Sequence, residues 1–373
     1  MIQTPILFFG DSPSLKTGLG RIGRDLAIRT AEMPEFRVGF LGRGGIGSRD
    51  IPVMQYDFDE VRGWGNDAMI RHVWEDFAGD KGGIIFAIYD PSRTNWLSQG
   101  DWISKRRHKV KLWTYVPIDS ACGNERLTGQ EHDALYGFDR ILAYGEYGSR
   151  ILSNTMGVPV DWLPHGIDTR TFHPQDRGAA RVAMEARERD KILGCVMTNQ
   201  ARKDWPVAAQ TLARLPDWKG WFHVDVDTRH WNLPELLDQF GVRDRVKLTY
   251  AGSMNDTDLA FFYSACDVFI LPSSEGFGFP IAESLACGTP VVHSSHAGGC
   301  WGLSTVKYIS PTGYRIEGPF SRVRPMFDSE QWAEVVANGT HSTREECVES
   351  VAHLDWDMLF PGRWAKWFKE GVC

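Results

Sequence analysis

Residues 267–290 read DVFILPSSEGFGFPIAESLACGTP, and this stretch decides the fold that we predict. The apolar run Val268–Leu271 is typical of a buried parallel strand. Pro280 suits the first turn of a helix, where its fixed φ and missing N–H cost nothing. Gly288 is placed to end that helix before a second apolar run, Val291–His293. The stretch therefore predicts a strand, a glycine-containing loop, a helix and a second strand.

The loop and the start of the helix carry the chemistry. Gly276 and Gly278 allow a ligand to approach the backbone closely, and N–H groups at a helix start attract an anion. Glu275 and Glu283 could both face one cleft. Because a carboxylate repels phosphate, we expect Glu283 to bind hydroxyl groups instead, such as the paired hydroxyls of a ribose.

The segment EGFGFPIAE, from Glu275 to Glu283, resembles the Glu-x7-Glu signature of the retaining glycosyltransferases of family 4, as does the CGTPVV that follows it. The resemblance implies an α/β protein of the GT-B fold, with two Rossmann-like domains that face a cleft. In that family the second Glu holds the ribose, while the first Glu and the glycine loop meet the donor sugar and its phosphate. The resemblance assigns the ribose role to Glu283 and the sugar and phosphate contacts to Glu275, Gly276, Phe277 and Gly278. The alternative is a helix whose two Glu side chains are only solvated.

The composition is that of an ordinary soluble globular protein. The 373 residues are 42% hydrophobic and 24% charged, a length that suggests two domains. A net charge of −7 argues against a surface that binds nucleic acid over its whole area. Seven cysteines show neither a CxxC pair nor metal-ligand spacing, so we expect reduced thiols and no bound metal. Neither a signal peptide nor an 18-residue apolar run is visible, and we expect a cytoplasmic protein.

The N-terminal region predicts a second site built from a strand, a glycine stretch and a helix. Gly18, Gly20 and Gly23 have the G-x-G-x-x-G spacing of dinucleotide-binding folds, which raises an NAD(P)-dependent oxidoreductase as an alternative. That alternative needs an acidic residue after the second strand, and the sequence has Arg43 there, which would suit a 2′-phosphate. In the family that the chain resembles, a similar loop faces the acceptor and the donor phosphate, so Gly18 and Gly20 become candidate donor-binding residues.

One dense cluster of cations lies at Lys105, Arg106, Arg107 and Lys109. Cations at the end of a helix complement its dipole, which is the simpler explanation. The alternative is a patch for an anionic acceptor, such as a hydroxylated base in DNA.

Asp119 follows the predicted strand Leu112–Val116, and the carboxyl ends of parallel strands border ligand clefts. The family that the chain resembles has a His near this point that contacts the donor sugar. Asp119 is the nearest candidate for that catalytic contact, and a simple turn residue is the alternative. His165 is either a base or a residue that positions the backbone.

The predicted strand Lys191–Thr198 leads into a loop with Asn199, Arg202 and Lys203. Two cations between a strand and a helix suit a diphosphate. In the family an Arg and a Lys of this loop replace a metal; Lys203 matches the family position well and Arg202 imperfectly. The alternative is that both cations only cover the surface.

The resemblance also implies a division of the chain. We expect an N-terminal acceptor domain over residues 1–170, a nucleotide-sugar domain over 171–352, and a C-terminal aromatic helix over 353–373 that crosses back to the first domain. In the second domain we place the nucleobase near Ser253 and Met254, and residues 298–327 are predicted to form an insertion or lid.

The predicted activity is metal-independent transfer of a sugar from a UDP- or GDP-sugar to a hydroxyl acceptor, with no further cofactor. The acceptor could be a saccharide, another small molecule or a hydroxylated DNA base. The remaining alternative is a non-catalytic protein that binds sugar nucleotides or nucleic acid.

Overall fold

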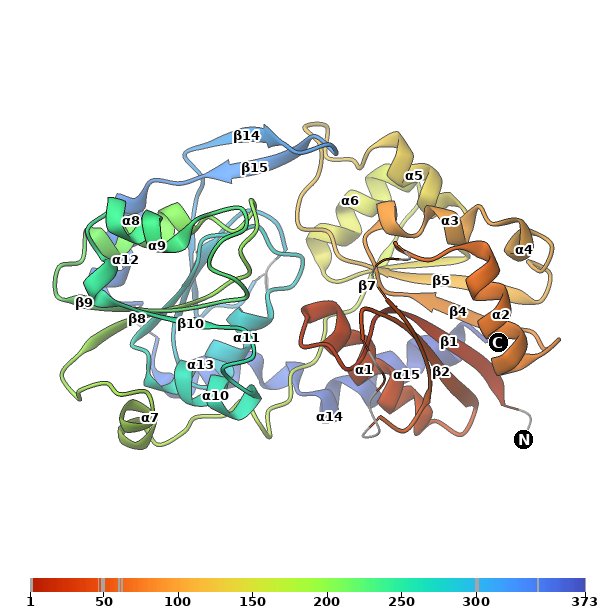
Figure 1. The fold of residues 1–373 in the computed structure, drawn as a ribbon, viewed down its shortest axis with the longest axis horizontal. Helices are drawn as coiled ribbons and strands as arrows, with labels where there is room; N and C mark the ends of the chain where they lie inside the picture. The colour runs from red at the N-terminus through yellow and green to blue at the C-terminus, as the bar shows by residue number, and fades with distance from the viewer. Residues whose placement is uncertain are drawn as a thin grey trace. The chain divides into compact units, whose positions relative to one another are not determined.

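The computed structural model describes residues 3–45, 47, 51–59, 61, 63–298, 302–340 and 342–372. The chain divides into two compact units: unit 1 contains the residues up to His165 and those from Phe360 onward, and unit 2 runs from Gly166 to Leu359. Each unit is built on a parallel β-sheet that carries helices (Figure 1). The predicted α/β architecture of two Rossmann-like domains is therefore confirmed.

Unit 1 has a seven-stranded sheet in the order β3-β2-β1-β4-β5-β6-β7. The neighbouring strands pair in parallel: β1 Thr4–Asp11, β2 Phe36–Arg43, β3 Met54–Phe58, β4 Gly83–Ala87, β5 Val110–Val116, β6 Arg140–Ala143 and β7 Asp161–Trp162. The strand order reverses between β1 and β4, which makes this the switch point where open α/β sheets bind ligands.

The helices of unit 1 cover both faces of this sheet. They are α1 Gly18–Ala31, α2 Asp67–Ala78, α3 Asn95–Ser98, α4 Asp101–Ser104, α5 Gly129–Tyr136, α6 Glu146–Met156 and α15 Ala365–Glu370. Side chains alternate along β1, as they must in a strand. Leu7 and Phe9 join Trp74 of α2 in one buried cluster, whereas the ring of Phe8 contacts Phe368 of α15 on the other face.

The C-terminal aromatic segment is helical but not a regular α-helix. It consists of α14 Trp356–Leu359, a π-helical turn Phe360–Trp364, and α15, which follow one another without a gap. Pro361 lies in the π-helical turn, and a proline inside a helix removes one backbone hydrogen bond, which accounts for this irregularity. The aromatic residues still form the core of this region, because Trp367 contacts the ring of Trp113 at 5.1 Å.

Unit 2 has a six-stranded sheet in the order β10-β9-β8-β11-β12-β13, with its switch point between β8 and β11. The strands are β8 Lys191–Val196, β9 Trp218–Val224, β10 Val246–Tyr250, β11 Val268–Leu271, β12 Val291–Ser294 and β13 Val306–Ile309. The helices are α7 Arg177–Ala183, α8 Trp205–Ala213, α9 Leu233–Gln239, α10 Asp256–Ala265, α11 Phe279–Ala286, α12 Ser329–Asn338, α13 Arg344–Val351 and α14. The predicted strand–loop–helix–strand unit is thus β11, α11 and β12.

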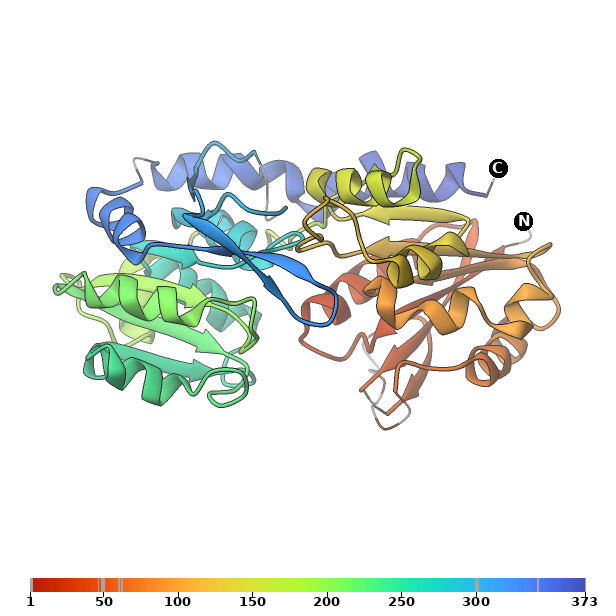
Figure 2. The same ribbon diagram turned by 90° about the horizontal axis from the view of Figure 1, so that it is seen from above.

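The region predicted as an insertion or lid has two parts. Strand β13 extends the main sheet, and β14 Gly313–Glu317 and β15 Arg322–Met326 pair as a separate antiparallel hairpin. This hairpin projects from the body of unit 2 (Figure 2). Residues 299–301, part of a loop that resembles one of the family, lie outside the described residues.

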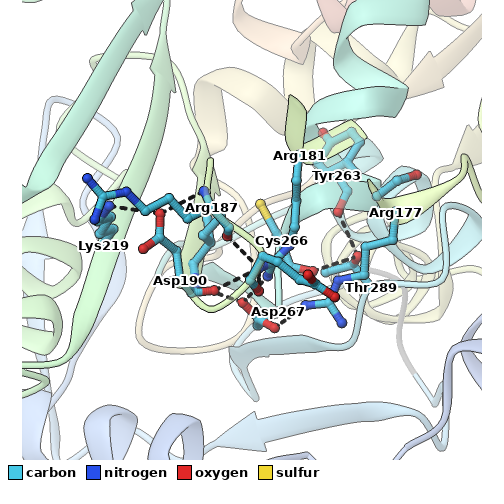
Figure 3. Close-up of polar contacts among 12 residues, drawn as sticks. Arg177, Arg181, Arg187, Asp190, Lys219, Tyr263, Cys266, Asp267 and Thr289 are labelled. Carbon is cyan, nitrogen blue, oxygen red and sulfur yellow. Dashed lines mark hydrogen bonds and ion pairs between the residues drawn. The ribbon is translucent and has the colours of Figure 1, made fainter. Parts of the chain in front are cut away.

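An ionic cluster, in which the Arg181 side chain is buried, holds α7 against the amino end of β11 (Figure 3). The carboxylate of Asp267 accepts hydrogen bonds from Arg177, from Arg181 at 2.8 Å and from the Ile192 N–H at 2.8 Å. The other end of the Arg181 guanidinium donates to three backbone carbonyls, including that of Asp190 at 2.9 Å. These contacts connect the start of unit 2 to its central strand.

None of the helices within the described ranges is both long enough and apolar enough to cross a membrane.

Candidate functional site

Two loops meet at the switch point of the unit 2 sheet. One follows β8 and the other follows β11, the two adjacent strands at which the order reverses. The loops are tied by an antiparallel bridge between Lys203 and Ser273 and by a 3.0 Å hydrogen bond from the Asp204 N–H to the Pro272 carbonyl. Residues far apart in the sequence are therefore held together where this fold class binds ligands.

The carboxylate of Glu275 is the centre of this site. Its Oε1 accepts hydrogen bonds from Lys203 Nζ and, at 2.5 Å, from the Ser273 hydroxyl, and Arg202 Nη1 lies 3.4 Å from its Oε2. Arg202 also donates to the Ser274 carbonyl at 2.9 Å. Glu275 and Lys203 are both buried. The structure thus brings together Arg202, Lys203 and Glu275, which the sequence assigned to one site.

Burial alone would raise the pKa of Glu275, but the neighbouring Lys203 and Arg202 cations outweigh that effect and lower it to about 2. Glu275 is therefore ionised at neutral pH. Since two cations surround one carboxylate, the site carries excess positive charge, which favours an anionic ligand such as a diphosphate.

The glycine loop has a backbone that other residues would not adopt. Gly278 has a φ of +87° and precedes α11, and Pro280 lies in the first turn of that helix. A Cβ atom at Gly298 would come within 2.7 Å of the Gly276 carbonyl, so the two segments approach closely. The Gly298 N–H also donates to the Glu275 carbonyl at 2.8 Å. The loop therefore presents the start of α11 beside the Glu275 cluster.

Glu283 lies on α11 with only 2% of its surface exposed. The hydroxyl of Tyr263, on α10, donates a 3.0 Å hydrogen bond to its Oε2. A buried carboxylate held by a neutral donor can accept further hydroxyl groups at its remaining lone pairs.

The sequence did not single out four polar residues of this region: Ser273, Ser274, Tyr263 and His293. His293 Nδ1 donates to the Leu271 carbonyl at 2.7 Å, because a carbonyl can only accept. Burial lowers the pKa of His293 to about 4, so its Nε2 is an unprotonated acceptor at neutral pH. Among the described contacts, neither this Nε2 nor the Ser274 hydroxyl has a hydrogen-bond partner. The signal that could have revealed His293 is its place at the carboxyl end of a parallel strand.

Asn199 connects backbone segments. Its side-chain NH2 donates to the carbonyls of Val226 and Trp231, and its carbonyl accepts from the Trp231 N–H at 2.9 Å. Asn199 therefore shapes the loop that carries Lys203.

Ser253 and Met254 follow β10, the edge strand, which lies two strands away from β8. The structure does not bring them beside the Glu275 cluster.

In unit 1 the predicted glycine loop is wrong in its secondary structure. Gly18, Gly20 and Gly23 lie inside α1, which Thr17 caps by accepting from the Gly20 N–H. A Cβ atom at Gly20 would come within 2.8 Å of the Leu15 carbonyl, and one at Gly23 within 2.7 Å of the Phe40 ring. Close packing therefore accounts for the absence of a side chain at Gly20 and Gly23.

Asp119 lies three residues beyond β5 and is half-buried. His165 is fully buried, its Nδ1 lies 2.8 Å from the Tyr115 hydroxyl, and burial holds its pKa well below the ordinary value. A neutral His in an aromatic environment favours the structural role for His165 over a base.

The basic cluster of unit 1 is paired with acids. Lys105 lies 2.6 Å from Asp101, Arg107 lies 2.9 Å from Asp139, and Arg106 and Lys109 share Asp80. These pairs neutralise much of the charge that a polyanion would need.

The switch point of unit 1 holds a different set of groups, of which the sequence singled out only Arg43. The Tyr89 hydroxyl donates to Asp11 at 2.9 Å, and the guanidinium groups of Arg43 and Arg93 stack on Trp64 at 3.8 and 4.1 Å. These groups can contact hydroxyls and anions.

Among the described parts of both units, no group of three His, Cys, Asp or Glu side chains could hold a metal ion.

A family model described as "Glycosyl transferases group 1" matches residues 186–307. These residues include β8, β11 and α11, and hence Arg202, Lys203, Glu275 and Glu283.

Curated relatives include D-inositol 3-phosphate glycosyltransferases of Mycobacterium. The protein of strain KMS is 31% identical over 282 residues, which cover 69% of this chain and 61% of the relative. The protein of Mycobacterium marinum is 30% identical over 295 residues. The chain thus spans less than two thirds of the length of these relatives.

Solved structures with a similar fold include sucrose-phosphate synthase from Thermosynechococcus elongatus, with a TM-score of 0.80 and 16% identity over 99% of both chains. Anabaena HepE in complex with UDP and glucose has a TM-score of 0.73 and 14% identity, again over 99% of both chains. At such identities the likeness shows the fold alone.

Proposed function

We propose that this chain, which has the GT-B fold and a glycosyltransferase group 1 domain at residues 186–307, transfers a sugar from a nucleoside diphosphate sugar to a hydroxyl acceptor with retention of configuration. The observation that carries the proposal is the convergence of Arg202, Lys203 and Glu275 at the switch point of unit 2. Their excess positive charge and the adjacent start of α11 suit a diphosphate.

In the proposed reaction the bond between the anomeric carbon and the diphosphate oxygen breaks, and its electron pair stays on the diphosphate. Lys203 and Arg202 neutralise that developing charge, which lowers the barrier to bond cleavage. The acceptor hydroxyl forms the new bond to the anomeric carbon and gives up its proton, for which a phosphate oxygen of the leaving group is the nearest base. Glu275 orients the two cations, and its backbone together with Gly276, Phe277 and Gly278 lines the place of the sugar.

Glu283 is assigned to the ribose, and Asp119 to the transferred sugar. Tests of these two roles differ in the expected readout. Glu283→Gln should weaken nucleotide binding by roughly 1.5–3 kcal/mol, the value of a hydrogen bond to a charged group. Asp119→Asn should lower kcat more than donor affinity, because its contact is strongest when positive charge develops on the sugar.

The acceptor is proposed to be a small polyhydroxy molecule. The relatives named as D-inositol 3-phosphate glycosyltransferases support this class. The groups at the switch point of unit 1, Asp11, Tyr89, Arg43 and Arg93, suit hydroxyls and an anion. The ion pairs of the basic cluster weigh against a DNA acceptor.

The test is a thermal-shift screen of UDP- and GDP-sugars, followed by mass analysis of products formed with polyol and sugar-phosphate acceptors. We expect a shift with one nucleotide sugar and a product heavier by one glycosyl unit, with the same yield in EDTA. A strict requirement for Mg²⁺ would contradict the role given to Lys203 and Arg202. Failure to bind any nucleoside diphosphate would contradict the proposed function itself.

A further inference from the structure

Tyr263 is a buried tyrosine whose hydroxyl meets the other Glu of the site. Tyr263 has no exposed surface, and only 2% of the surface of Glu283 is exposed. The Tyr263 hydroxyl lies 3.0 Å from Glu283 Oε2, and the two residues belong to different helices, α10 and α11. The phenol O–H donates a hydrogen bond to that carboxylate oxygen.

The position of the Tyr263 ring is fixed from several sides. Its ring centroid lies 5.4 Å from that of Phe269 in β11 and 6.3 Å from that of Phe172. The Thr289 hydroxyl, at the end of α11, donates to the Tyr263 carbonyl at 2.6 Å (Figure 3). Arg344 of α13 connects the same two helices, because it donates to the carbonyl of Ser264 in α10 and to that of Cys287 after α11. Helix α10 is therefore tied to the middle of α11 and to the segment just after its carboxyl end, and these contacts fix the place of the Tyr263 hydroxyl.

A carboxylate that must accept two hydroxyls of a ligand needs a fixed rotamer and a negative charge. Burial works against the charge, because it favours the protonated form of a carboxyl group. A hydrogen bond donated to the carboxylate opposes this effect. Glu283 also lies close enough to the Cys287 thiol that its charge helps raise the pKa of that thiol, second to burial. The Tyr263 hydroxyl is a buried donor that reaches Glu283 from another helix.

We infer that Tyr263 is a positioning residue for nucleotide binding: it holds Glu283 Oε2 so that the carboxylate can accept the two hydroxyls of a ribose. This inference rests on the ribose role of Glu283 in the proposed function. Tyr263 does not touch the ligand, so its loss acts only on contacts that Glu283 makes. The inference therefore predicts a loss of discrimination between a ribose and a ribose without hydroxyls.

The experiment compares the wild type with Tyr263→Phe by calorimetry, using UDP or GDP, whichever binds more tightly, and its 2′,3′-dideoxy analogue. Phe keeps the ring and its packing. We expect the affinity for the ribonucleotide to fall about tenfold, the loss of about 1.4 kcal/mol, while that for the dideoxy analogue stays unchanged. Tyr56→Phe, which removes a tyrosine hydroxyl that donates to a carboxylate of unit 1, Asp76, at 2.6 Å, should leave both affinities as they are.

Two results would overturn the inference. One is a fall in both affinities by the same factor, which would mean general damage, and the other is no change in either. If Tyr263→Phe alone does not fold, the double variant Tyr263→Phe/Glu283→Gln removes the stranded charge. It must then show the same preference for the ribonucleotide as Glu283→Gln alone, and a further loss would overturn the inference. A wild type that binds neither nucleotide would instead contradict the proposed function.

Discussion

Strand β11 has a bound carboxylate at each end, and the two differ in how completely their surroundings satisfy them. At the amino end, Asp267 accepts from Arg177, Arg181 and the Ile192 N–H, and Arg181 uses its other donors on backbone carbonyls. Of the Arg181 side-chain nitrogens only Nε is without a partner in the described structure. The cluster connects elements of unit 2.

At the carboxyl end, Glu275 is also bound by two cations, but polar atoms around it are unused. Ser274 Oγ and His293 Nε2 are buried without a hydrogen-bond partner among the described residues. Buried polar atoms without partners are costly, and they persist in proteins mostly where they have a function. The comparison favours a stabilising role for the amino end of β11 and supports the proposed ligand site at its carboxyl end, where parallel sheets bind ligands.

The largest effect that tests this comparison is on stability at the amino end. Asp267→Ala leaves the buried Arg181 guanidinium without its carboxylate, so the free energy of unfolding should fall by roughly 3–5 kcal/mol. The affinity for a nucleoside diphosphate should not change in the folded fraction. Denaturant titration and calorimetry measure the two quantities, and a loss of affinity would mean that the two ends are not separate in function.

At the carboxyl end, Lys203→Met should affect both quantities. It strands Glu275 and removes a cation from the diphosphate, so the unfolding free energy falls, and affinity falls about 10- to 100-fold. The double variant Lys203→Met/Glu275→Gln removes the stranded charge and should regain most of the stability but none of the affinity. Recovery of nucleotide affinity in the double variant would contradict the role of Lys203.

The sequence could predict the carboxyl-end site because its parts are local. Glu275, the two glycines, Pro280 and Glu283 lie within one short stretch, and loop, helix start and helix face follow from their spacing. The strand–loop–helix pattern also placed Lys203 at the end of β8, and parallel strands bring such ends together. The pattern could not reveal which atoms of neighbouring elements meet, so Tyr263 and His293 escaped notice.

The sequence could not reveal the packing of unit 1 for a related reason. From their spacing alone, the glycines at 18, 20 and 23 predict a ligand loop. Gly20 and Gly23 also let α1 approach the Leu15 carbonyl and the Phe40 ring, and such contacts depend on tertiary packing. The partners of Arg106, Arg107 and Lys109, which are Asp80 and Asp139, likewise lie far away in the sequence, whereas Lys105 pairs with Asp101 four residues earlier.

Acid should weaken the carboxyl end of β11 in two separate windows of pH. The pKa of His293 lies at about 4 in the folded protein, below its ordinary value of 6.5, so stability falls as pH drops from 6.5 towards 4. The pKa of Glu275 is lowered from 4.5 to about 2, so its contribution is complete above 4.5 and is lost as pH falls towards 2. Denaturant titrations across pH should lose the first slope in His293→Asn and the second in Glu275→Gln. Unchanged slopes in both variants would show that other groups control acid stability.

The smallest expected effect is the most specific. It is the change in stability when a single buried hydroxyl is removed, and this change should differ between two serines. Ser274 and Ser284 are both fully buried, but only Ser284 has a use for its hydroxyl, which donates to the Thr289 carbonyl at 3.1 Å. Ser284→Ala removes that bond and should cost about 1 kcal/mol of stability. Ser274→Ala removes an unsatisfied group, so stability should stay the same or rise by up to about 1 kcal/mol. If the Ser274 hydroxyl serves a ligand, donor affinity must fall in Ser274→Ala and stay unchanged in Ser284→Ala. Thermal unfolding and calorimetry on both variants decide this, and equal costs in stability with no change in affinity would remove the distinction between the two ends of β11.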